Sequence, residues 1–310
     1  MLEAPARFCP RDGSMLVEVG APTISRQLLD GRYEVIRRLG AGGMSYVYLA
    51  RDRATGERVA VKVLAPRLSA DPTSRQRLER EAACAMRLDH PNLCRILRHG
   101  RTADGLLYLV MPCLEGELLS DRERRAGPFP LEPGLELLRQ LCRGLHHAHA
   151  LDVVHRDLKP ENVMLVPDPA SPLGERAVVL DFGLAKARPA GPELLKLTAT
   201  GIVLGTPEFM SPEQVRGRPL DGRSDIYSLA VVGFEMFTGR LPFEGQGAQE
   251  LMVARLRGRP SPLRAFRPDL PSRLEEILDR AMATDPADRF PTMLDLAAAL
   301  EEVRAARPPQ

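Results

Sequence analysis

The stretch VVHRDLKPENVML, residues 153–165, is an apolar run that breaks into a short charged loop and turns apolar again. Within the loop, Asp157, Lys159 and Asn162 supply a carboxylate, an ammonium and a carboxamide. Phosphoryl transfer needs such groups to orient a hydroxyl, to offset charge on the moving phosphoryl group and to hold a metal ion. The pattern therefore predicts a chemically active loop between two buried strands.

This loop resembles the catalytic loop of protein kinases, H-R-D-L-x-x-x-N, with every fixed position matched. The resemblance implies that Asp157 accepts the proton of a substrate hydroxyl, that Lys159 offsets charge near the γ-phosphate, and that Asn162 binds magnesium. The position of Lys159, together with the structural residue Thr206, resembles Ser/Thr rather than Tyr kinases. Met164 is expected to line the ATP site.

A glycine-rich turn lies upstream, between two stretches that are typical of strands, 33–39 and 47–50. Glycines let a backbone fold over phosphates with no side chain in the way. Ser45 stands where the pattern G-x-G-x-x-G has its third glycine, and an ordinary hairpin is the alternative interpretation. The kinase resemblance assigns the turn and one following residue to ATP binding: Gly40, Ala41, Gly42, Gly43, Met44, Ser45 and Val47.

The stretch RVAVKVL alternates, so that Val59, Val61 and Val63 share one face of a predicted strand and Ala60 and Lys62 share the other. In protein kinases the small residue lies against adenine and the lysine reaches the α- and β-phosphates, which the resemblance implies for Ala60 and Lys62. A solvated charge at a strand edge is the alternative for Lys62. The glycine turn upstream disfavours it.

A helix is predicted to begin with Asp71 as its N-cap and Pro72 at its first position. Glu81 falls on the apolar stripe of this helix, whereas Glu79 falls off it and is expected to be solvated. An unpaired buried carboxylate is costly, so Glu81 needs a cation as its partner. The resemblance makes Lys62 that partner and places Glu81 in the catalytic machinery.

An apolar strand at 106–111 leads into residues 112–116, the predicted hinge between two lobes. By resemblance, Met111 is the gatekeeper, while the Pro112 carbonyl and the Leu114 N–H contact adenine. Proline lacks only the N–H, which this position does not use. The hinge is therefore compatible with ATP.

An aspartate at the end of a buried strand opens the tripeptide Asp181-Phe182-Gly183. It matches the D-F-G motif of protein kinases, in which the aspartate holds magnesium between the β- and γ-phosphates. The motif begins 24 residues after Asp157, a kinase-like spacing. We therefore expect Asn162 and Asp181 to bind Mg²⁺, with Mn²⁺ as an alternative ion.

The C-terminal half carries three residues with expected structural roles. Glu213 ends a segment that resembles the end of a kinase activation segment, and by resemblance it pairs with Arg289 in a buried ion pair. Asp225 starts a helix that is apolar nearly all round, over 226–237, and is expected to accept N–H groups from the catalytic loop.

The composition and the N-terminal segment indicate which partners and which cellular compartment to expect for the chain. A net charge of +2 over 310 residues gives no reason to expect nucleic acid as a partner. The five cysteines lack metal-ligand spacing, and no stretch is apolar enough to span a membrane, so we expect a cytoplasmic protein. Residues 1–29 are expected to be a flexible extension with a remnant zinc-ribbon-like knuckle at Cys9; a zinc site completed by a partner chain is the alternative.

The motifs occur in kinase order over about residues 31–303, and the chain is identified as a member of the bacterial, eukaryotic-like Ser/Thr protein kinases. The resemblance implies the two-lobed α+β kinase fold, with a small antiparallel β-sheet lobe carrying one main helix and a larger, mostly helical lobe. The expected partners are ATP and protein substrates, with self-association for trans-autophosphorylation as one option. A nucleotide-binding scaffold without catalysis and a docking role for residues 1–29 are the alternatives. The predicted divisions are a kinase domain at 30–305 (lobes 30–111 and 117–305) and a tail at 306–310.

The segment before Glu213 generates a prediction about regulation. Thr198 and Thr200 stand seven and five residues before Gly205, where related bacterial kinases carry activating threonines. Arg156 is expected to lack a counter-ion near the loop, and a phosphothreonine, which carries about −1.5 to −2 charges at neutral pH, is expected to pair with it. Mass spectrometry should find phosphate on Thr200 and Thr198 in active protein and none in Asp157→Asn. If the Thr198→Ala/Thr200→Ala variant keeps its full rate, the two threonines are plain loop residues.

Overall fold

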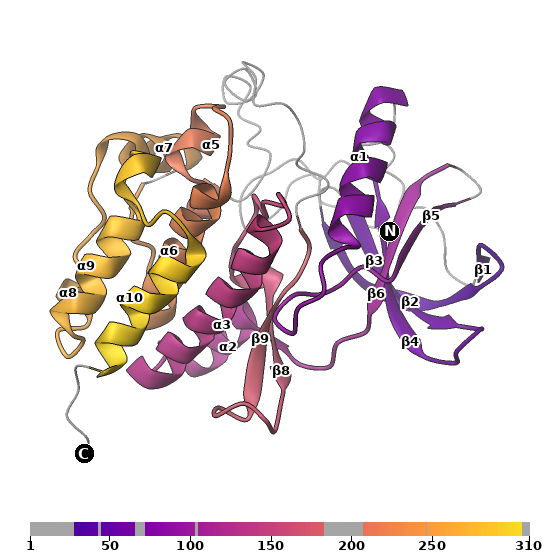
Figure 1. Cartoon of the computed structure of the whole chain (residues 1–310), viewed down its shortest axis with the longest axis horizontal. Helices are drawn as coiled ribbons and strands as arrows, with labels where there is room; N and C mark the ends of the chain where they lie inside the picture. The colour runs from indigo at the N-terminus through magenta and orange to yellow at the C-terminus, as the bar shows by residue number, and fades with distance from the viewer. Residues whose placement is uncertain are drawn as a thin grey trace, which may run out of the picture.

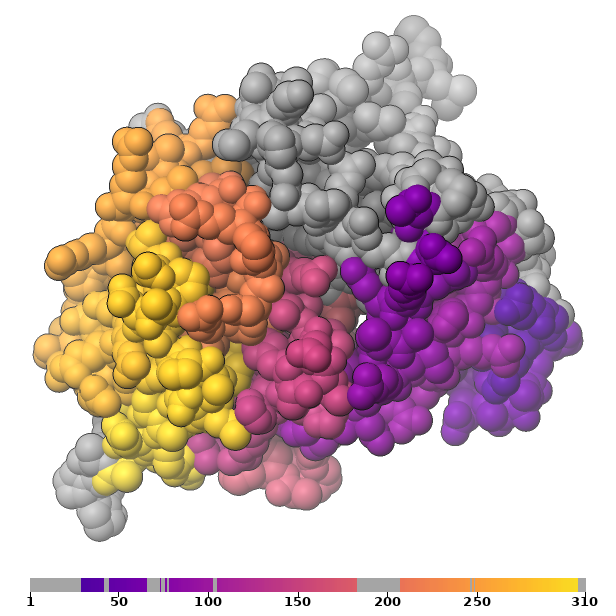
Figure 2. Space-filling model, turned by 45° about the horizontal axis from the view of Figure 1, so that its top comes forward, coloured from indigo at the N-terminus to yellow at the C-terminus, as the bar shows by residue number. Residues whose placement is uncertain are grey.

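The computed structural model describes residues 28–42, 45–65, 72–102, 105–182, 207–245 and 247–305. These residues form two lobes, seen at opposite sides of Figure 1, with the N-terminal residues in one and the C-terminal helices in the other. The space-filling view in Figure 2 shows the same division. The predicted fold class is thus confirmed. Within the described ranges, no helix has both the length and the apolar character needed to cross a membrane.

The smaller lobe is an antiparallel sheet with one helix. Its six strands are ordered β1-β2-β3-β4-β6-β5, and every neighbouring pair runs antiparallel. The elements are β1 (Leu28–Leu29), β2 (Tyr33–Gly42), β3 (Ser45–Asp52), β4 (Arg58–Leu64), α1 (Pro72–Ala85), β5 (Arg98–Arg101) and β6 (Leu107–Pro112).

The alternation predicted for β4 is present in the fold. Val59, Val61 and Val63 are at most 3% exposed and pack in one apolar cluster with other strand residues. Ala60 and Lys62 point to the opposite face, where Ala60 packs against an apolar cluster that contains Met111 and continues into the larger lobe. Burial of three valines thereby forces Lys62 toward the junction of the two lobes.

The larger lobe surrounds a long buried helix. Its helices are α2 (Leu119–Ala126), α3 (Leu131–His149), α5 (Pro212–Val215), α6 (Gly222–Thr238), α7 (Ala248–Arg257), α8 (Leu263–Phe266), α9 (Ser272–Ala281) and α10 (Met293–Ala305). A small sheet joins β7 (Glu117–Leu118), β8 (Val163–Pro167) and β9 (Glu175–Val179). Short 3₁₀ turns are η2 (Pro160–Asn162), η4 (Pro207–Phe209) and η5 (Pro286–Asp288).

Helix α6 is buried on nearly all sides, as its continuous apolar sequence predicts. Asp221 caps its first turn by accepting the Arg223 N–H, and Gly239 ends it in the left-handed conformation at φ 69°. A helix fixed at both ends and packed all round is a rigid support for groups at its first turn. Asp225 occupies that turn.

The expectation of a strand before the catalytic loop is wrong. Val153 and Val154 do not form a strand before the catalytic loop, because α3 runs to His149 and a turn follows directly. Val153 instead packs on the core as part of this turn. Two apolar residues without a neighbouring strand to pair with cannot form a ladder.

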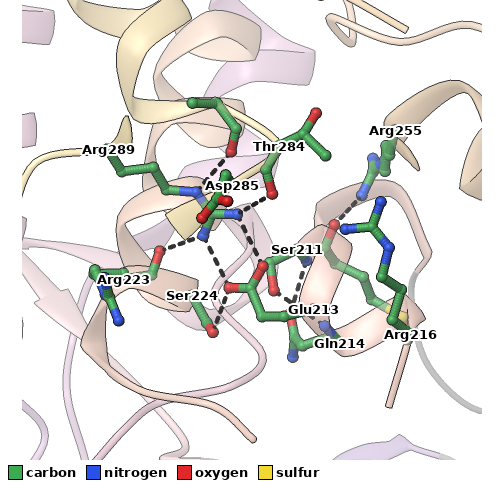
Figure 3. A network of polar contacts seen from close by, with 12 residues as sticks. Ser211, Glu213, Gln214, Arg216, Arg223, Ser224, Arg255, Thr284, Asp285 and Arg289 are labelled. Carbon is green, nitrogen blue, oxygen red and sulfur yellow. Dashed lines mark hydrogen bonds and ion pairs between the residues drawn. The ribbon is translucent and has the colours of Figure 1, made fainter. Parts of the chain in front are cut away.

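A buried ion pair ties the segment around α5 to the end of the chain (Figure 3). Arg289 donates two hydrogen bonds of 2.8 Å to the Glu213 carboxylate, as the sequence predicts, and its side chain is 0% exposed. The same guanidinium donates to the carbonyls of Ala283 and Arg223, and Ser224 donates to Glu213. Burial acts to raise the pKa of Glu213, but the hydrogen bonds and charge of Arg289 lower it overall.

Loss of one partner in this pair is expected to destabilise the larger lobe. Arg289→Ala leaves the Glu213 carboxylate buried without its cation, which costs about 3–5 kcal/mol of unfolding free energy. Arg273→Ala, which breaks only exposed pairs with Glu276 and Glu302, is the control and should cost about 0–1 kcal/mol. Urea titration measures both. Equal losses of unfolding free energy in the two variants would contradict the prediction that the buried pair stabilises the lobe more than the exposed pairs do.

Candidate active site

The catalytic loop is held by the buried carboxylate of Asp225. This carboxylate is 0% exposed, accepts the backbone N–H groups of His155 and Arg156 at 2.8 and 2.9 Å, and lies 2.7 Å from His149 Nε2. Burial acts to raise the pKa of Asp225, but its bond to His149 and the charges of His149 and His155 lower it overall. The expected contact between Asp225 and the loop is therefore confirmed.

Arg156 adopts a strained backbone at this point. Its φ of 65° lies in the left-handed region that non-glycine residues rarely use. Asp225 holds its N–H, and Gln214 Nε2 donates to its carbonyl oxygen at 2.8 Å. The conformation of the residue before Asp157 is thus fixed from both sides by two different helices.

The predicted magnesium ligands belong to one hydrogen-bonded unit. Asn162 Nδ2 donates to the Asp157 carbonyl at 2.8 Å, and the Leu180 N–H donates to the Asn162 carbonyl at 2.8 Å. His155 Nε2 lies 2.8 Å from the Leu180 carbonyl, and its ring packs edge-on against Phe182. The catalytic loop and the strand end that carries Asp181 are therefore joined directly.

The cations and carboxylates of the cleft pair differently from expectation. Lys62 Nζ lies 3.0 Å from Asp181 Oδ1, whereas Glu81 Oε1 lies 3.8 Å from Arg156 Nη1. The predicted pair of Lys62 with Glu81 is not formed, and the expectation that Arg156 lacks a counter-ion is also wrong. Asp181 lies beside Lys62 and neutralises its charge. Glu81 pairs instead with the guanidinium of Arg156 in the catalytic loop.

The register of the sheet determines where the predicted hinge residues lie. Ala60 pairs with Met111 and Val59 with Pro112, so β6 carries the chain from the small lobe directly past Ala60. Met111, Lys62 and Asp181 line one small cavity between the lobes, and Leu114 packs on the core of the larger lobe. Met164 on β8 is half-buried. Of the predicted ATP-site residues, Lys62 and Met111 thus lie at this cavity, together with Asp181.

The glycine turn is a hairpin of β2 and β3, with Gly40 opposite Val47 and Gly42 opposite Ser45. A Cβ at Gly40 would meet no atom within 4 Å, so packing does not explain that glycine. Several predicted residues lie outside the described ranges: Cys9, Gly43, Met44, Asp71, Thr198, Thr200 and Thr206.

Four glutamates beside the catalytic loop form a group that the sequence does not predict. They are Glu161 in the loop, Glu123 on α2, Glu208 on η4 and Glu235 on α6. Burial and the charges of Glu235 and Glu161 raise the pKa of Glu123 to about 8; burial and the charges of Glu161 and Glu208 raise the pKa of Glu235 to about 7. No pattern along the sequence could reveal this group, because its members come from four separate elements.

Comparisons with known proteins agree with this geometry. Residues 33–299 match the protein kinase domain family. The chain is 38% identical over 285 residues to the serine/threonine-protein kinase PknA of Mycobacterium tuberculosis, covering 91% of this chain and 63% of PknA. It is 36% identical over 270 residues to the serine/threonine-protein kinase PrkC of Bacillus subtilis, covering 87% of this chain and 40% of PrkC. It thus spans less than two thirds of these relatives. The crystal structure of the Mycobacterium tuberculosis PknI kinase domain is similar, with a TM-score of 0.70, 31% identity and coverage of 90% of this chain and 98% of that one.

The buried glutamates predict a pH dependence of stability. The pKa of Glu235 rises from an ordinary 4.5 to about 7 on folding, so the folded state binds more protons between these values and loses stability as pH rises through them. Glu235→Gln removes this loss. Its melting temperature should exceed that of the parent by more at about pH 8 than at about pH 5.

Glu57→Gln, in the exposed turn between β3 and β4, serves as the matched control because it changes the same charge at a solvated site. Differential scanning calorimetry across the pH range gives the comparison. A melting-temperature difference for Glu235→Gln that does not grow with pH would contradict the interpretation.

Proposed function

Because the chain belongs to the protein kinase domain family, we propose that it transfers the γ-phosphate of Mg-ATP to Ser and Thr hydroxyls of proteins. The observation that carries the proposal is the unit formed by Asp157, Asn162 and the strand end at Asp181, with Lys62 beside it. The names of its Ser/Thr-kinase relatives support the same activity.

The residues suit magnesium and ATP. Asp181 offers a carboxylate that is 30% exposed, and the amide nitrogen of Asn162 is used within the loop, which leaves its oxygen for a metal. Mg²⁺ prefers such oxygen ligands beside phosphates, and Mn²⁺ accepts them too. Bound Mg-ATP would supply the phosphoryl group. Lys62 would then exchange Asp181 for the phosphates.

Asp157 would orient the substrate hydroxyl and accept its proton, and Lys159 would offset charge as the phosphoryl group moves. The clamped backbone of Arg156 supports this role, because it fixes the direction of the next side chain. Protein substrates in the cytoplasm are the acceptors that we infer. A scaffold without catalysis is the second candidate, but Asp157, Asn162 and Asp181 all keep the residue types that catalysis requires.

Regulation by autophosphorylation in trans is part of the proposal. Thr198 and Thr200 lie outside the described residues, but their expected partner Arg156 is described and is paired with Glu81 at 3.8 Å. A phosphothreonine carries more charge than Glu81 and would compete for this guanidinium. Phosphorylation would therefore change the pairing in the cleft.

Variants of the catalytic residues test the activity. Asp157→Asn, Lys62→Met and Asp181→Asn should each lower the rate of transfer to a Ser/Thr peptide by about 10²–10⁴-fold or more, because each removes a charge that the reaction requires. Asp181→Asn should also reduce the rise in melting temperature that Mg-ATP produces. Asp168→Asn, in the turn between β8 and β9, is the control and should keep the parental rate. Parental rates in all three catalytic variants would refute the assignment.

A further inference from the structure

A groove of about 880 Å³ lies on the larger lobe, separate from the residues that hold the catalytic loop. Its walls come from three places: the loop after α5 with Arg216 and Arg218, the segment after α7 with Arg259, and the stretch from α9 to η5. Every lining residue is within the described ranges. In Figure 3, Thr284 and Asp285 lie beside Arg289, and Arg216 lies beside Arg255. The groove thus borders the buried polar network of Glu213 and Arg289.

The charges around this groove are unusual in that they do not pair with one another. Three arginines and four carboxylates line it, yet no ion pair within 4.0 Å involves any of the seven in the described part of the chain. Arg216 reaches only a backbone carbonyl, that of Leu256, at 3.5 Å. Nearby arginines that do not line the groove, Arg223 and Arg273, each pair with carboxylates. The arginines of the groove come from the segments after α5 and α7, whereas its carboxylates come from the stretch from α9 to η5.

This lining selects the kind of ligand. No aromatic side chain is present on which a nucleobase could stack, and carboxylates outnumber arginines, which disfavours nucleic acid. Met282, Pro260 and Pro262 add apolar surface between the charges. The volume suits a short peptide rather than a single ion. A chain segment with a basic side chain and an acidic side chain complements both sets of charges.

We propose that this groove, the charged groove of Arg216, Arg218, Arg259, Glu275 and Asp279, is a docking site for protein substrates that carry such a mixed-charge segment apart from the phosphorylated residue. The proposal rests on the proposed kinase activity. One wall continues from α5, and Gln214 on α5 holds the carbonyl of Arg156 in the catalytic loop. A substrate bound in the groove is therefore tethered to the same rigid lobe that carries Asp157, which raises its effective concentration there.

The first experiment pans a phage-displayed library of random peptides, about 12 residues long, against the inactive Asp157→Asn chain. The enriched peptides should combine basic and acidic residues. Binding measured by fluorescence anisotropy should weaken at least about tenfold in Arg216→Ala/Arg218→Ala and in Asp279→Asn. Arg264→Ala, an exposed arginine on α8 that does not line the groove, should bind as the parent does. Enrichment of no peptide, or of peptides that bind the groove variants equally well, overturns the proposal.

The second experiment separates docking from catalysis. The enriched peptide is joined by a flexible linker to a Ser/Thr acceptor peptide and compared with the acceptor alone. The tethered form should show a KM at least about tenfold lower with an unchanged kcat, and the groove variants should lose this gain while retaining their rate on the acceptor alone. Equal KM values overturn the docking site and leave the kinase assignment intact. No transfer to either peptide refutes the kinase assignment itself.

Discussion

The carboxylate of Asp225 is the constraint on which the rest of the site depends. It lies on the first turn of α6, where the backbone N–H groups and the helix dipole favour a negative charge, and it is completely buried. A buried carboxylate must find donors, and its donors are the N–H groups of His155 and Arg156. Because α6 is packed on nearly all sides, Asp225 is held rigidly and fixes the catalytic loop to the core.

A second clamp reaches the same residue from the other side. The ion pair of Glu213 and Arg289 fixes α5, and Gln214 on α5 accepts and donates in a capping box with Ser211 while also holding the Arg156 carbonyl. A left-handed backbone at a non-glycine residue costs of order 1–3 kcal/mol and persists only when the surroundings overdetermine it. Two independent clamps on Arg156 meet that requirement. The buried ion pair of Glu213 and Arg289 therefore acts on the active site indirectly, because it helps to fix the backbone conformation of Arg156.

The sequence predicted what depends on local pattern and motif, and it was wrong where the result depends on how elements meet. Alternation located β4, and the apolar run located α6, because each period reflects one element in one environment. The pairing of Glu81 depends on the relative position of α1, the catalytic loop and the strand end at Asp181. The sequence does not reveal how these three elements are placed relative to one another. The group of four glutamates that includes Glu161 could not be predicted for the same reason. Val153 was predicted to lie in a strand because an apolar pair does not show whether a partner strand is present.

The segment that leads from η4 into α5 shows how firmly this lobe presents its surface. Ser228 donates to the Phe209 carbonyl at 2.8 Å, and Arg255, 1% exposed, donates to the Met210 carbonyl at 2.7 Å. Burial lowers the pKa of Arg255, and its guanidinium lies over the ring of Phe243. Burial of this cation is costly, and its hydrogen bond to the Met210 carbonyl and its contact with the Phe243 ring offset part of that cost. This segment and the charged groove flank α5, which means that one rigid element sets the relation between the catalytic loop, the segment before α5 and the groove.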